Sequence, residues 1–169
     1  MLKNNVKMRV LCIGAHPDDI ELMAGGTVSR FINENIYVTF LILSDGVWKN
    51  QIGETVRNSL ETIKEQKEVS KSLGISFEIL NEVAANFVYK DDLVLKVLKI
   101  IEYHNIDTLI IPWIEDLHHD HKITAQIAIS ASRRIPRVLM GQINYHYEKV
   151  FTPNFFVDIS EYWNKKIEI

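Results

Sequence analysis

Two short stretches of the sequence gather histidine and aspartate side chains that could bind a metal ion. The first is His16-Pro17-Asp18-Asp19, and the second is Asp116-Leu117-His118-His119-Asp120-His121. Zinc takes histidine nitrogen and carboxylate oxygen when no thiolate is available, and a catalytic zinc keeps three protein ligands and one position for water. The chain has one cysteine, so a cysteine-based zinc site and an intrachain disulfide are both excluded. His16, Asp19 and one histidine of the second stretch would complete a zinc site.

Such a ligand set predicts the chemistry of a hydrolase. Zinc lowers the pKa of its bound water to about 7, which supplies a nucleophile at neutral pH. A carboxylate that does not bind the metal is then needed as general base, and Asp18 is placed for this role. A second histidine would donate a hydrogen bond to the oxyanion. A phosphoesterase with two metals about 4 Å apart is an alternative, although the two stretches suit one ion better.

Each stretch taken alone also fits a purely structural role. Proline and aspartate are ordinary turn residues, so His16–Asp19 could form a turn with capping carboxylates. His118–His121 could begin a solvated helix that Asp120 caps. The two stretches together, each following a short apolar run, favour a metal site.

The elements that position these stretches alternate between strands and helices. Apolar runs predict strands at Val10–Ile13, Tyr37–Leu43, Ile75–Leu80 and Thr108–Ile111, with later candidates at Ile143–Tyr147 and Phe155–Ile159. Helical spacing predicts helices over Leu22–Asn33, Val56–Leu73, Asp91 or Asp92 to about His104, and after Asp120 to about Arg134, with a last helix capped by Ser160. This alternation predicts an α/β fold, a Rossmann-like three-layer domain with a mostly parallel sheet. In such sheets ligands bind beyond the carboxyl ends of the strands, where both stretches lie.

Length and composition limit the remaining classes of protein. The 169 residues suit a single domain over 1–169, and a chain of this length can bury a core without a structural metal. The formal net charge is -3 and no long block of like charges occurs, so neither a nucleic-acid arm nor a nucleic-acid partner is expected. No apolar run is long enough for a signal or membrane segment, so a cytoplasmic location is the default expectation.

The residues that carry the chemistry also resemble a known family. Ile13 to Leu22, which reads IGAHPDDIEL, and the following Gly25-Gly26-Thr27 resemble the signature of the PIG-L / LmbE-like zinc-dependent de-N-acetylases. His118-His119-Asp120-His121 fits the family's second motif, His-x-Asp-His. Ser44-Asp45-Gly46, Leu73-Gly74 and the ending from Pro153 onward also fit, so the resemblance covers nearly the whole chain. Members of this family remove acetyl groups from N-acetylglucosamine conjugates, including precursors of bacillithiol and mycothiol.

The resemblance implies a role for each residue of the two motifs. The zinc ligands would be His16, Asp19 and His121, although such a site also accepts iron or cobalt. Asp18 would be the general base and His118 would stabilise the oxyanion. Asp120 would orient His118 from behind. His119 stands where many relatives have proline, and it gains no role from the family pattern.

The implied substrate is a small amino-sugar conjugate, and its contacts are less well specified by the motifs. Family members often carry an arginine three residues before a glutamate, and here Thr62 stands three residues before Glu65. Arg57 is the candidate substitute, and a solvated arginine at the helix end is the alternative role for it. Asp45 and the aromatic face of Trp113 are further candidates for substrate binding, and Trp48 is a second candidate aromatic residue at the mouth of the site.

The resemblance leaves the assembly and the state of the chain open. Relatives often form homo-oligomers, and they usually run some tens of residues further, so this chain is either a short form of the deacetylase domain or truncated. A sugar- or nucleotide-binding module without turnover therefore stays an alternative.

Overall fold

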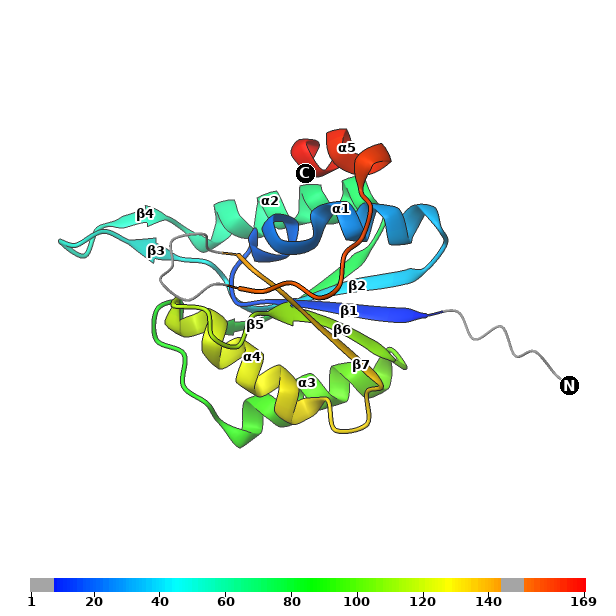
Figure 1. The fold of residues 1–169 in the computed structure, drawn as a ribbon. Helices are drawn as coiled ribbons and strands as arrows, with labels where there is room; N and C mark the ends of the chain where they lie inside the picture. The colour runs from blue at the N-terminus through cyan, green and yellow to red at the C-terminus, as the bar shows by residue number, and fades with distance from the viewer. Residues whose placement is uncertain (1–7, 144–150) are drawn as a thin grey trace, which may run out of the picture.

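The computed structural model describes residues 8–143 and 151–169, and a five-stranded sheet forms its centre (Figure 1). In spatial order the strands are β5 (Ser76–Glu82), β2 (Tyr37–Ser44), β1 (Arg9–Gly14), β6 (Thr108–Pro112) and β7 (Arg137–Gly141). Every neighbouring pair runs parallel. A parallel sheet is covered on both faces, which explains why β1, β2 and β6 are mostly apolar and buried.

Helices cover both faces of this sheet, so the domain has three layers. α1 (Asp19–Asn33) and α2 (Ser59–Leu73) lie on one face, and α3 (Asp91–Tyr103) and α4 (His119–Ala131) lie on the other (Figure 1). The last elements are a 3₁₀ turn, η1 (Ser160–Tyr162), and α5 (Trp163–Glu168), which pack on α1. The predicted α/β fold with its three layers and parallel sheet is confirmed.

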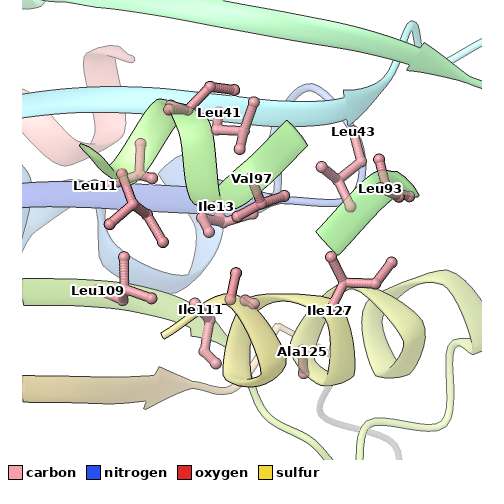
Figure 2. Packing of buried hydrophobic residues seen from close by; sticks show 14 of the residues in the cluster. Leu11, Ile13, Leu41, Leu43, Leu93, Val97, Leu109, Ile111, Ala125 and Ile127 are labelled. Atoms are coloured by element: carbon pink, nitrogen blue, oxygen red, sulfur yellow. The ribbon is translucent and has the colours of Figure 1, made fainter. Parts of the chain in front are cut away.

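The alternation of side chains along the strands divides the core into two parts. Leu11 and Ile13 of β1 join the cluster under α3 and α4 (Figure 2). Val10 and Cys12 face the other way, into the cluster under α1. Cys12 is fully buried, and this burial raises the pKa of its thiol, as expected for a small core residue rather than a reactive one.

The segment after β2 contains strands that the sequence did not predict. It holds a two-stranded antiparallel hairpin, β3 (Trp48–Lys49) and β4 (Thr55–Arg57). The following helix begins at Ser59 instead of Val56 because Asn58 accepts hydrogen bonds from the first turn and forms a capping box with Glu61.

The prediction was also wrong at other element ends. The strand β7 was missed, and Phe155–Ile159 forms no strand, while residues 144–147 of the other late candidate lie outside the described residues. Lys90 precedes the first turn of α3 without a side-chain cap, so neither Asp91 nor Asp92 caps it. Among the described residues, no helix combines the length and apolar character needed to cross a bilayer.

Candidate active site

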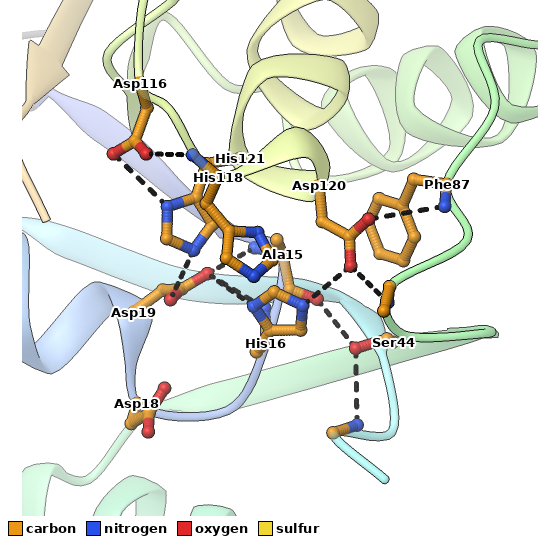
Figure 3. A network of polar contacts seen from close by, with 12 residues as sticks. Ala15, His16, Asp18, Asp19, Ser44, Phe87, Asp116, His118, Asp120 and His121 are labelled. Atoms are coloured by element: carbon orange, nitrogen blue, oxygen red, sulfur yellow. Dashed lines mark hydrogen bonds and ion pairs between the residues drawn. The ribbon is translucent and has the colours of Figure 1, made fainter. Parts of the chain in front are cut away.

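The two histidine-aspartate stretches meet at the carboxyl ends of neighbouring strands. His16–Asp19 connects β1 to α1, and His118–His121 spans the start of α4 after β6. β1 and β6 pair directly in the sheet, so their carboxyl ends carry the two stretches to the same edge. Figure 3 shows the side chains of both stretches pointing toward one another.

The carboxylate of Asp19 shapes the first loop and faces the second. Its Oδ2 accepts hydrogen bonds from the backbone N–H of Ala15 at 2.8 Å and of His16 at 2.9 Å. Its Oδ1 lies 3.1 Å from Nε2 of His121. Asp19 is buried, so its position is fixed from both sides.

Asp18 precedes the first turn of α1 but does not cap it. Its backbone has φ +101°, in the left-handed region that a side chain other than glycine adopts at some energetic cost. Aspartate before a helix usually accepts a backbone hydrogen bond, and Asp18 accepts none there, so a capping role is excluded. Partial burial and the neighbouring Asp19 charge raise the pKa of Asp18, which suits a carboxylate that takes up a proton.

Three imidazoles form the group that could hold a metal ion. One ring nitrogen from each of His16, His118 and His121 lies within 4.8 Å of the others. Nδ1 of His16 is 3.6 Å from Oδ2 of Asp19. The donor set is therefore nitrogen and carboxylate oxygen, which fits zinc and related divalent ions.

In two of these imidazoles, the second ring nitrogen lies beside a buried aspartate, a different one for each ring. Nε2 of His16 lies 2.9 Å from Oδ2 of Asp120, and Nδ1 of His121 lies 3.2 Å from Oδ2 of Asp116 (Figure 3). Both aspartates are fully buried. Such pairs fix the orientation of a metal-binding histidine, and they leave Nδ1 of His16 and Nε2 of His121 for the ion.

These contacts correct one predicted role and add a residue that the sequence reasoning missed. Asp120 was expected to orient His118, but its carboxylate bonds to His16, and no hydrogen bond joins it to His118 among the described residues. Asp116 received no role from the sequence. The only available signal was a carboxylate two residues before His118, in the same loop.

The contacts between imidazoles and carboxylates also shift the pKa values of both kinds of group. Burial disfavours a charge on His16, but its hydrogen bonds to Asp120 and Asp19 outweigh this and raise the pKa of His16 to about 9. Burial is likewise outweighed at Asp19, whose pKa is lowered by His121 and His16. An ion that binds here must therefore displace a proton from His16 at neutral pH.

His118 lies beside the other two rings but in a different environment. Its ring stacks on His121 with centroids 4.5 Å apart, and its residue is exposed. Partial burial and the neighbouring His121 and His16 lower the pKa of His118. No carboxylate within the described residues hydrogen-bonds to its ring.

A cavity of about 730 Å³ opens in front of these groups. Its lining includes His16, Asp18 and His118 from the two stretches, together with the predicted substrate residues Asp45 and Arg57. A neighbouring cavity of about 410 Å³ shares Asp18 and Arg57 but contains none of the three histidines. The larger cavity is therefore the one in which a substrate would meet the metal site.

Arg57 and Thr62, the residues considered for the family's arginine position, lie in different surroundings. Arg57 ion-pairs with Glu65 and lies 3.6 Å from Asp18, so it reaches the site from β4. Thr62, at the family's arginine position, is buried, and its hydroxyl donates to the backbone oxygen of Asp45.

The two tryptophans expected at the mouth of the site lie in different environments. The ring of Trp113 packs edge-to-face on Phe151, with centroids 5.4 Å apart, and Trp113 is absent from the cavity lining. A role for Trp113 in substrate binding therefore stays a prediction. Trp48 of β3 lines the cavity.

Comparison with known proteins identifies the family. The family model described as PIG-L, GlcNAc-PI de-N-acetylase, matches residues 11–132, which is more than half of the chain. The chain belongs to the PIG-L family. The matched segment runs from β1 to the end of α4 and so contains both stretches.

Individual relatives of this PIG-L protein are deacetylases. Diacetylchitobiose deacetylase of Thermococcus kodakarensis is 26% identical over 182 residues, covering 97% of this chain and 68% of the relative. A probable N-acetyl-alpha-D-glucosaminyl L-malate deacetylase 2 of Bacillus cereus is 27% identical, over 78% of this chain and 64% of its own length. This PIG-L protein is thus a hydrolase of the deacetylase class.

A solved structure shares the fold. N,N'-diacetylchitobiose deacetylase from Pyrococcus horikoshii superposes with a TM-score of 0.78 at 22% identity, over 99% of this chain and 71% of that one. At this identity the likeness supports the three-layer fold alone.

Proposed function

We propose that this PIG-L protein is a zinc-dependent hydrolase that removes the N-acetyl group from an N-acetylglucosamine-type sugar or conjugate. The observation that carries the proposal is the convergence of His16, Asp19 and His121 beside the cavity that Asp18 lines. His16 and His121 each have the second ring nitrogen on a buried carboxylate, as metal-binding histidines do.

We assign the third imidazole, His118, to the reaction rather than to the metal. It lies close enough to be a ligand, but its ring is more exposed and lacks a carboxylate partner among the described residues. Its lowered pKa keeps it neutral near pH 7, when one ring nitrogen carries a hydrogen that can be donated. That hydrogen would stabilise the negative charge on the acetyl oxygen in the transition state.

Asp18 would accept the proton from the attacking water and pass it to the leaving amine. It is exposed to the cavity and makes no capping hydrogen bond, so its carboxylate is available. A bound metal would act as a Lewis acid and lower the pKa of water. Zinc fits the nitrogen and oxygen donors, and ferrous iron or cobalt would fit them as well.

The cavity and the relatives support an amino sugar as the substrate class. A volume of about 730 Å³ lies in the range of small-molecule sites. Asp45 and Arg57 supply groups for the hydrogen bonds that sugar hydroxyls need, and the exposed ring of Trp48 supplies an apolar face. Both relatives described above are named for N-acetylated sugars.

The test is an acetate-release assay over a panel of N-acetylglucosamine conjugates and diacetylchitobiose. Each reaction is run as purified, after chelation, and after adding back zinc, iron or cobalt. We expect release that chelation abolishes and one metal restores. Phosphate release from phosphoesters, or tight sugar binding without acetate release, would overturn the proposal in favour of a phosphoesterase or a binding module.

A further inference from the structure

One wall of the cavity is a loop that follows β5. We call Val83–Phe87 the wall loop, and its first residues, Val83, Ala84 and Ala85, line the cavity. Within the loop, the backbone N–H of Asn86 donates a hydrogen bond to the backbone oxygen of Val83 and closes a turn. The wall loop therefore depends on contacts from elsewhere to hold its shape.

Three hydrogen bonds attach the wall loop to the first turn of α4. Oδ2 of Asp120 accepts from the N–H of Ala85 at 2.6 Å, and Oδ1 accepts from the N–H of Phe87 at 3.3 Å. Nε2 of His119 lies 2.7 Å from the backbone oxygen of Phe87. A carbonyl oxygen only accepts, so Nε2 of His119 carries the hydrogen and donates it.

The backbone of the wall loop needs this attachment. Ala85 has φ +61°, in the left-handed region that disfavours alanine. Such a conformation persists when surrounding contacts fix it. At the far end of the loop, Phe87 is buried in the core and its ring centroid lies 6.0 Å from that of His16.

We propose that His119 is a positioning residue that holds the wall loop in place for substrate binding. Asp120 already ties the loop to the metal-site residue His16, and His119 adds the tie at the Phe87 carbonyl. His119 does not line the cavity, so it acts on the substrate through the loop. The effect on substrate rests on the proposed deacetylase function, whereas the effect on the loop does not.

The test compares three substitutions of His119 in the full chain loaded with zinc. The amide of His119→Gln can reach the position of Nε2 and donate, whereas the shorter His119→Asn cannot, and His119→Ala has no donor. We expect the alanine and asparagine variants to raise KM about tenfold, because roughly one hydrogen bond is lost. Their kcat should change by less than about twofold. His119→Gln should restore KM. Lys122→Ala on the same turn, whose side chain makes no hydrogen bond within the described residues, is the matched control.

Hydrogen exchange without substrate supplies the second readout. In His119→Ala the amides of Ala85 and Phe87 should exchange about tenfold faster than in the wild type. The glutamine variant should protect both amides again, with zinc content unchanged throughout. Unchanged exchange in the alanine variant, or equal loss in the glutamine variant, would overturn the proposal. If the wild type released no acetate from any sugar, the proposed function would fail while this exchange result still decided the role of His119.

Discussion

At the scale of single residues, the neighbours Asp18 and Asp19 have carboxylates in opposite environments. Asp19 is buried and fully engaged by backbone amides and His121, whereas Asp18 faces the cavity. The turn separates them by placing Asp18 in a left-handed conformation. This difference in environment supports the proposed roles, Asp19 as a metal ligand and Asp18 as the general base.

Asp18→Asn should keep the metal and lose most of the turnover. Asparagine tolerates the left-handed backbone at this position, so the loop should keep its shape and only the base is removed. We expect kcat to fall by about 10²- to 10⁴-fold. Metal content by elemental analysis and acetate release together check this. Loss of the metal in this variant would contradict the division between base and ligand.

His118→Ala should reduce rate more than metal affinity. Within the described residues no hydrogen bond or ion pair joins its ring to a buried carboxylate, so His16 and His121 should keep their orientation. Loss of one oxyanion donor should lower kcat by about 10²- to 10³-fold. A metal titration beside a steady-state assay separates the two effects, and a near-normal rate would remove His118 from the mechanism.

Asp116→Asn should weaken metal binding. The asparagine can still accept the hydrogen bond that Oδ1 of Asp116 receives from the N–H of His118 at 2.8 Å. It cannot supply the charge that faces Nδ1 of His121. Substitution of such outer partners costs about 10- to 100-fold in metal affinity, so competition with a chromophoric chelator should show a loss in that range. Unchanged affinity would leave Asp116 with a role only in the backbone turn.

At the scale of elements, the paired glycines of α1 allow the last segment of the chain to pack closely. A Cβ at Gly26 would lie 2.6 Å from Cδ1 and 3.0 Å from Cβ of Ile159. A Cβ at Gly25 would meet the end of the Ile169 side chain at 3.2 Å. The two positions therefore differ in how easily their neighbours can move.

Gly26→Ala should destabilise the protein, and Gly25→Ala is its matched control. Overpacking against the base of a side chain costs about 1–3 kcal/mol. Alanine gains about 1 kcal/mol over glycine in a helix, so Gly25→Ala should be close to neutral because the Ile169 tip can shift. Urea denaturation of both variants measures the difference. Equal stability would mean that Ile159 is free to move.

At the scale of the whole molecule, the apolar core predicts a fold that forms without a metal ion. Two apolar clusters fill the spaces between the sheet and its two helix layers, and the metal-site residues lie at one edge of this arrangement. A core of this size stabilises a domain without a structural ion. We therefore expect a bound ion to serve the proposed chemistry and not the fold.

Chelation should remove activity and leave the fold intact. Far-ultraviolet circular dichroism of the metal-free protein should match that of the loaded protein, and its thermal unfolding should remain one cooperative transition. Its Tm should be lower than that of the loaded protein. A metal that binds only the folded state adds its binding free energy to the free energy of unfolding, and chelation removes that contribution. A metal-free chain without helical signal would instead show that the ion holds the fold together.

The sequence by itself determined the α/β alternation and placed histidine and aspartate side chains after two of the strands. These features are local, because residue type and apolar periodicity are set by neighbours along the chain. The residue types in His16–Asp19 fit both a turn with capping carboxylates and a catalytic loop, so the sequence left both roles open. The missing side-chain cap at Asp18 excluded the capping role.

Only the tertiary structure decided which groups pair across the site. Asp120 contacts His16, Asp116 contacts His121, and His119 holds the wall loop. Trp113 packs away from the cavity that Trp48 lines. These partners are far apart in sequence or set by loop geometry, and they meet because parallel pairing of β1 with β6 brings two distant loops to one edge of the sheet. Strand order is a property of the packed sheet, and apolar periodicity along the chain identifies strands without giving their order.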